Sequence, residues 1–293
     1  MTKPNLKTTL AILGAITVLP AILPTMAVAQ DESARYAACI QLTQNDPDSA
    51  FDRAIAWRDD GGGMPARHCA ALALIGLRLY EEGATRLEEL AVAPGNATAD
   101  LRTQILAQAS TAWLDAGQEE RALVPLDRAV TMGEQAGIPR PTQIMVRLDR
   151  AALLTSLQQD DKALADVQFA LTQPTIAVRQ RIEALYIRAS IFHGRGEHQA
   201  VVNDTTAALD WGGTKAGLYL IRAEAYAGLG YPDLARKDLL TFLTQEPDGK
   251  RSDTARLMLE KLEAFIAEEK ARPSTHPAQT DQPPASGGQP AAR

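Results

Sequence analysis

The side chains best suited to metal or nucleophilic chemistry are four histidines and two cysteines, but their spacing does not converge on a site. His193 and His198 flank a turn at Gly196 on two expected helices, and no third His or Cys lies nearby to complete a zinc site. His68 precedes Cys69, and adjacent residues of a helix point in different directions, which argues against a thiol–imidazole pair. We therefore expect no catalytic residue, no bound metal and no cofactor.

Longer motifs that carry chemistry are missing from the sequence as well. It contains no G-x-S-x-G turn, no H-E-x-x-H helix and no Walker-type loop. The triple glycine at residues 61–63 follows no strand and precedes no phosphate-binding lysine, so we interpret it as a plain loop. The net charge of −6 argues against binding to nucleic acid and to anionic lipid heads, since both need clustered Lys and Arg. The sequence thus predicts a protein that is not an enzyme and does not bind nucleic acid.

Residues 1–29 have the three parts of a secretory signal peptide. Two lysines give a positive start, a mostly apolar stretch spans residues 10–23, and small residues at 27–29 suit signal peptidase. Cleavage is expected after Ala29. The alternative is an uncleaved anchor, but two prolines interrupt the segment and its apolar run is shorter than the roughly 20 residues that span a bilayer. We expect an exported, periplasmic protein with no integral membrane span after cleavage.

Cys39 and Cys69 are the only cysteines, and both lie beyond the predicted cleavage point. Two thiols in an oxidising compartment often pair. Each falls in a helix-like segment, at residues 36–43 and 66–80, and these two helices could stack on each other. We predict a disulfide that would stabilise the fold by about 3–4 kcal/mol in the chain-entropy model. Two buried free thiols are the alternative interpretation.

A small residue, a large apolar residue and a turn recur five times along the chain. The small residue stands seven positions before the turn and the large one four before it. Successive turns are 34, 41, 38 and 34 residues apart, the period of a helical-hairpin array. The first unit fits this pattern worst. The turns are placed at Gly83, Gly117, Gln158, Gly196 and Gly230.

This registered pattern resembles the tetratricopeptide repeat (TPR) family, and residues 218–247 match it best. The resemblance implies an all-α fold, an α-solenoid of stacked antiparallel helix pairs, with about five TPR-like hairpins over residues 64–250. We expect an N-terminal helical region at 30–63 and an amphipathic helix at 251–271 that caps the open end of the array. The alternative for that helix is docking to a partner or dimerisation. The proline-rich tail, 272–293, is expected to be disordered.

A charge pattern also recurs in three of the units. An arginine precedes the small residue of the first helix, and an aspartate follows sixteen residues later. We interpret these as structural ion pairs that fix helix register, and an arginine row that binds acidic peptides is the alternative. The pairs are Arg150 with Asp166, Arg188 with Asp204, and Arg222 with Asp238.

In the TPR family the first helices line a concave groove, and the resemblance implies which residues face it here. Apolar members such as Met145, Leu148, Tyr186 and Leu220 would anchor an extended or helical segment, although some of them could merely fill the inner face. We therefore expect a scaffold or adaptor that binds a protein or peptide of the bacterial cell envelope. The alternative is a structural subunit of a homo- or hetero-oligomeric envelope assembly. The predicted groove set is Gln104, Thr111, Met145, Leu148, Glu183, Tyr186, Ser190, Leu220 and Glu224.

Overall fold

The structure, a computed structural model, describes residues 24–95 and 97–271, and in them it contains thirteen α-helices and no strand. This confirms the predicted all-α solenoid. The expected disordered tail and most of the expected signal peptide lie outside the described residues. The helices are α1 (Pro24–Asn45), α2 (Pro47–Asp59), α3 (Gly63–Gly76), α4 (Tyr80–Val92), α5 (Ala99–Asp115), α6 (Glu119–Ala136), α7 (Arg140–Ser156), α8 (Asp160–Leu171), α9 (Val178–Gly194), α10 (His198–Asp210), α11 (Ala216–Gly228), α12 (Pro232–Gln245) and α13 (Lys250–Ala271).

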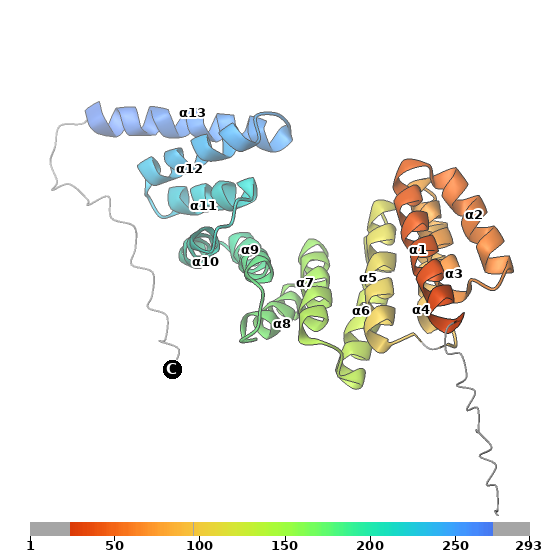
Figure 1. The fold of residues 1–293 in the computed structure, drawn as a ribbon. Coiled ribbons are helices and arrows are strands. Elements are labelled where there is room, and N and C mark those ends of the chain that lie inside the picture. Colours follow the sequence, from red (N-terminus) through yellow and green to blue (C-terminus); the bar gives the residue numbers. More distant parts are fainter. Residues whose placement is uncertain (1–23, 96, 272–293) are drawn as a thin grey trace, which may run out of the picture.

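From α3 to α12 the helices form five hairpins that stack into an arc (Figure 1). In each hairpin a short turn joins the two helices, so they run antiparallel. The first helices α7 and α9 lie on the inner side of the arc, whereas α8 and α10 lie on its outer side (Figure 1). The first helices therefore form the inner face of the protein.

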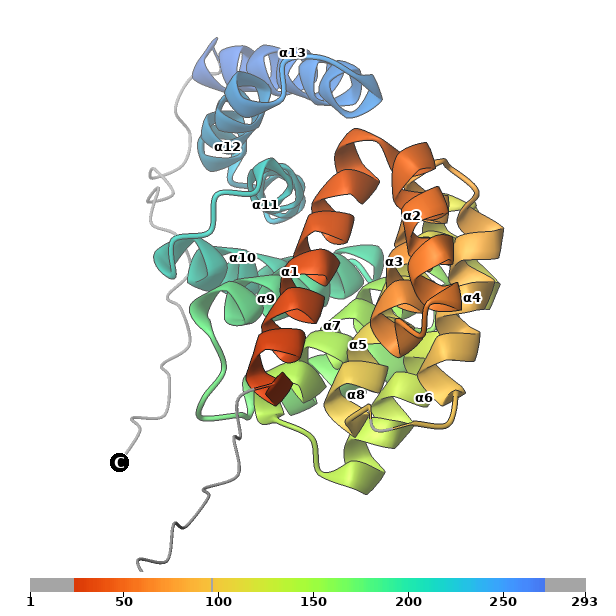
Figure 2. The same ribbon diagram turned by 45° about the vertical axis from the view of Figure 1, so that its right-hand side comes forward.

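The N-terminal helices α1 and α2 pack beside α3, as the turned view shows (Figure 2). Asp46 caps α2 by accepting a hydrogen bond from Ser49 N, and Pro47 supplies the first helical residue. Helix α1 is longer than the helix-like segment expected at residues 36–43, because it begins at Pro24, within the predicted signal peptide. No helix of residues 24–95 and 97–271 is long and apolar enough to cross a membrane.

The turn inside each hairpin is made by one residue in the left-handed conformation, which ends the first helix and lets the chain reverse. Four of the five predicted turn positions hold a residue in this conformation. Three of them are glycines, which adopt it readily. The four are Gly117 (φ 72°), Gln158 (φ 59°), Gly196 (φ 70°) and Gly230 (φ 79°).

The first predicted turn, at Gly83, is wrong. The left-handed residue of this hairpin is Arg78 (φ 62°), and Gly83 lies inside α4. A Cβ on Gly83 would stand 2.6 Å from Ile75 Cγ1, so this glycine serves close packing of α4 on α3. The first unit fits the repeat pattern poorly only because its turn was placed five residues too late, at Gly83 instead of Arg78. With the turn at Arg78, the buried Leu74 takes the large apolar position that the exposed Leu79 had been given.

Small and large apolar residues alternate through a continuous core between the hairpins. Ile144 of α7, Ala163 of α8 and Ile187 of α9 belong to one buried cluster, so each hairpin is completed by its neighbour. At the C-terminal end Ala255 of α13 packs with Phe242 of α12 and covers the last hairpin. The core thus runs the length of the array.

Candidate interaction surfaces

The three arginine–aspartate pairs are each brought together between the two helices of one hairpin. Arg188 on α9 is bidentate, with both Nε and Nη2 at 2.7 Å from the carboxylate oxygens of Asp204 on α10. Arg222 and Asp238 repeat this geometry at 2.7 and 2.9 Å. The aspartates are buried, and hydrogen bonding to Asp204 raises the pKa of Arg188 further. These contacts fix the packing of the second helix on the first.

Two of these arginines, Arg150 and Arg222, also reach the preceding hairpin. Arg150 binds Asp166 at 2.7 and 2.8 Å, and its Nη1 lies 2.9 Å from Asp127 of α6. Arg222 Nη1 donates to Thr206 of α10 at 3.1 Å. Because internal acceptors occupy these guanidinium groups, the geometry favours a structural role over a row of arginines open to acidic peptides.

The first two hairpins carry other residues at these paired positions, which lie eight residues before and after the turn. In the second hairpin both are uncharged, and both Ala109 and Pro125 are buried. In the first hairpin, counted from Arg78, they are Ala70 and Arg86. This hairpin therefore has one cation where later hairpins have a buried anion, and no arginine opposite it.

Two members of the predicted groove set are wrongly placed as binding anchors. Leu148 is 4% exposed and Leu220 is 9% exposed, and both lie in core clusters between hairpins. Met145 and Tyr186 are only partly buried and remain accessible on the first helices. The inner face therefore offers fewer apolar anchors than the sequence predicted.

Three polar members of the set are occupied locally. Gln104 Nε2 donates to Asp100 at 3.0 Å, one turn earlier on α5. The Thr111 hydroxyl donates to a backbone carbonyl of the same helix, and so does that of Ser190. Each bond satisfies one donor and leaves the side chain's acceptor oxygens available.

The charged members, Glu183 on α9 and Glu224 on α11, each pair with a residue outside their own helix. Lys215, at the start of α11, pairs with Glu183 and lies 5.0 Å from the centre of the Tyr186 ring. His193 Nε2 is 2.5 Å from a carboxylate oxygen of Glu224. Desolvation and repulsion by Glu183 raise the pKa of Asp149 to about 6. The inner face thus combines two half-buried apolar side chains with a surplus of carboxylates.

The two cysteines meet where α1 crosses α3. Their Cα atoms are 6.2 Å apart and their sulfur atoms are in bonding contact. Nearby, the Tyr36 hydroxyl donates to His68 Nδ1 at 2.6 Å, and His68 Nε2 donates to Gln108 Oε1 at 2.6 Å. Desolvation lowers the pKa of His68, in keeping with a neutral ring that links α1, α3 and α5. This histidine is a packing residue, not a partner of the neighbouring thiol.

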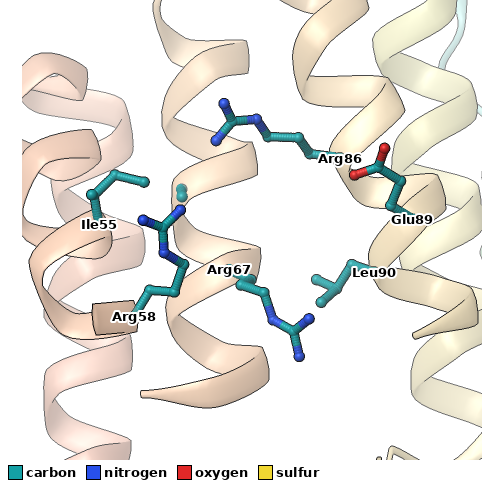
Figure 3. Close-up of a pocket in the computed structure, with 7 residues that line it drawn as sticks. Ile55, Arg58, Arg67, Arg86, Glu89 and Leu90 are labelled. Carbon is teal, nitrogen blue, oxygen red and sulfur yellow. The ribbon is translucent and has the colours of Figure 1, made fainter. Parts of the chain in front are cut away.

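Within residues 24–95 and 97–271, four of the best-formed cavities have no residue of the predicted groove set in their lining. One lies between α2, α3 and α4 and is ringed by the side chains of Arg58, Arg67 and Arg86 (Figure 3). Sequence reasoning missed these arginines because Arg58 lies before the array and the misplaced first turn hid the repeat position of Arg86. Among residues 24–95 and 97–271, no three His, Cys, Asp or Glu side chains are grouped so as to hold a metal ion.

Taken together, the hairpins, their left-handed turns and their shared core define the protein as a TPR-like α-solenoid. The apo form of the quorum sensor NprR from B. thuringiensis is a solved structure with the same fold. The two align with a TM-score of 0.58 and 13% identity over 87% of this chain and 74% of that one. The P58(IPK) TPR domain aligns with a TM-score of 0.40 and 14% identity, over 85% and 69% of the two chains. No protein-family model and no curated protein matches the sequence.

Proposed function

We propose that this protein is a non-catalytic scaffold or adaptor of the bacterial cell envelope that binds a peptide or protein segment along the inner face of its array. One observation carries this proposal. The first helices present Met145 and Tyr186, each of which packs one side against the core and leaves the rest accessible, and Tyr186 lies beside the charged cluster around Glu183. Fold alone does not determine function, so the proposal depends on this surface.

The inner face also favours one kind of segment. An apolar side chain would fit against Met145 and Tyr186, and a basic side chain beside Asp149 would relieve its repulsion from Glu183. A segment that carries a basic residue close to an apolar one satisfies both requirements. Such a segment can bind as an extended chain or as a helix.

Export to the periplasm is part of the proposal, with removal of residues 1–29. Two features support it: the signal-peptide pattern of the sequence and the cysteine pair, whose geometry suits a disulfide formed in an oxidising compartment. Mass spectrometry of the protein from periplasmic extract would show an N-terminus at Gln30 and a mass lower by two hydrogen atoms than that of the reduced chain. A chain that retains its N-terminus and stays in the cytoplasm would contradict this part.

The binding test is cross-linked capture from the envelope fraction, with the array as bait. In one variant Met145→Ala and Tyr186→Ala remove the apolar groups of the inner face. A matched control combines Val124→Ala and Leu240→Ala, two exposed apolar residues on second helices. A partner lost only from the inner-face variant supports the proposal. A partner that both variants retain would move binding away from this face.

A structural subunit is the second candidate, and one observation favours it. Helix α13 covers the last hairpin but leaves Leu257 and Phe265 exposed, along a cavity of about 330 Å³. Light scattering after gel filtration separates the two candidates. An adaptor elutes as an elongated monomer, whereas a subunit forms larger species that Leu257→Ser with Phe265→Ser would dissociate.

A further inference from the structure

The cavity between α2, α3 and α4 has a volume of about 350 Å³ and an unusually basic lining for an acidic protein. Arg58 comes from α2, Arg67 from α3 and Arg86 from α4, and their side chains surround one space (Figure 3). Glu89 is the only acidic residue that lines it. Three cations against one anion leave the space positively charged.

The repeat explains why this space exists. The third, fourth and fifth hairpins fill the equivalent site with an arginine on the first helix and an aspartate on the second, which neutralise each other. In the first hairpin the short side chain of Ala70 replaces that arginine, and Arg86 replaces that aspartate. The side chain on α3 is therefore smaller than in those hairpins, and the side chain on α4 carries a positive charge instead of a negative one. An anionic ligand would restore both what is missing in volume and what is missing in charge.

The contacts within the protein leave donors available on each guanidinium group, and that of Arg86 also lies over the Phe51 ring, 5.5 Å from its centre. Arg58 pairs at 2.8 Å with Asp59, its neighbour in sequence, and Arg86 pairs at 2.6 Å with Glu82, one turn away. Both carboxylates are exposed to solvent, and exposed pairs of this kind contribute little and exchange readily. Among residues 24–95 and 97–271, Arg67 makes one hydrogen bond, to Gly63 O of its own helix at 3.4 Å. Each arginine can therefore turn donors toward a ligand.

A second cavity, of about 430 Å³, adjoins the first and shares Arg67 and Leu90 with it. Its lining includes Met64, Ala93 and Pro94, which are apolar. The only further arginine there, Arg102, is held by backbone carbonyls, among them Ala91 O at 2.7 Å. A ligand that continues from the basic cavity thus enters an apolar one. This sequence of environments suits a chain molecule better than a small ion.

We propose that the cavity lined by Arg58, Arg67 and Arg86 binds the carboxylates of an acidic peptide segment, with an adjacent apolar side chain in the neighbouring cavity. Planar guanidinium groups bind carboxylates through two parallel hydrogen bonds, which gives the site directionality as well as charge. The site lies on α2–α4, away from the inner face of α7, α9 and α11. It would give the array a second binding site. Because the two sites lie on different helices, loss of peptide binding here can be observed separately from loss of binding at the inner face.

The test is fluorescence anisotropy with a fluorescein-labelled peptide that contains three consecutive glutamates followed by leucine. The matched peptide has three glutamines in their place. Arg67→Gln should weaken binding of the glutamate peptide about tenfold, which corresponds to about 1.4 kcal/mol. Arg236→Gln is the control, because this arginine of α12 is similarly exposed and makes one surface ion pair.

A second variant separates binding from folding. Ala70→Arg with Arg86→Asp installs the internal ion pair of the later hairpins, so it should fold normally, fill the cavity and abolish binding of the glutamate peptide. The proposal is overturned if the wild-type protein does not distinguish the glutamate from the glutamine peptide, or if both pocket variants bind like Arg236→Gln. Displacement of the peptide by an equal concentration of inorganic phosphate would show a general anion site and would also overturn the assignment.

Discussion

The pair of Arg188 and Asp204 gives the most direct test of how the array is held together. Its two hydrogen bonds are 2.7 Å long, and the side chains are 27% and 8% exposed. Arg188→Ala would leave the Asp204 carboxylate buried without its partner. Removing one member of a buried pair costs about 3–5 kcal/mol, and the partial exposure of the arginine places the expected loss near about 3 kcal/mol.

Removing both members should cost much less than the sum of the single losses. In Arg188→Ala with Asp204→Ala no charge is left buried, so we expect a double-mutant coupling energy of about 2 kcal/mol. The reference pair is Arg236 with Glu263, 3.0 Å apart and 46% and 49% exposed. An exposed pair of this kind should couple by less than about 1 kcal/mol.

Urea unfolding followed by circular dichroism and by tryptophan fluorescence would measure both cycles. Repeat arrays can unfold in stages, so the free energies are used only where the two transitions coincide. Equal m-values among the variants would show that the unfolded states are comparable. If Arg188 and Asp204 couple no more strongly than the exposed reference pair, they do not fix helix register and the structural interpretation fails.

Three further predictions concern other parts of the chain. Cys39→Ser with Cys69→Ser should lower the free energy of unfolding by about 3–4 kcal/mol, because the separation of 30 residues makes the closed loop long; equal urea midpoints with and without reductant would contradict this. Asp149 has a pKa raised to about 6, so stability should fall as pH rises from about 4 to about 6; Asp149→Asn should therefore increase the melting temperature more at pH 8 than at pH 4, which calorimetry can check. Gln158→Gly should stabilise by about 1 kcal/mol, since Gln158 adopts φ 59°, and chemical denaturation that shows a loss instead would refute the strain argument.

The parts of the structure that repeat were predictable from the sequence. Arg188 and Asp204 were assigned to one contact because the same two residue types stand sixteen positions apart in three hairpins. A buried ion pair requires both members at once, so its repeated presence is informative, and so is the joint replacement by Ala109 and Pro125. The turn at Gln158 was found despite its residue type, because the residues before it kept their spacing.

The inner face was harder to predict because its residues serve two purposes. A first helix contacts its own hairpin and both neighbouring ones, so the side of the helix that reaches solvent is narrow. Leu148 and Leu220 lie one helical turn or less from exposed positions, yet the adjacent hairpin covers them. Their burial depends on the angle between hairpins, which residue types do not specify. Sequence spacing alone therefore could not separate core residues from binding anchors.

The basic cavity could have been found only with the correct phase of the first hairpin. Placing the turn at Gly83 instead of Arg78 moved every comparison by five residues, and the replacement of a buried pair by Ala70 and Arg86 went unseen. In a repeat array, residues that recur serve the contacts that recur. In the first hairpin Ala70 and Arg86 replace the recurring arginine and aspartate, and the stacking of hairpins does not explain a cation at this position. That is why the first hairpin, and not the regular hairpins after it, is where an anionic partner should bind.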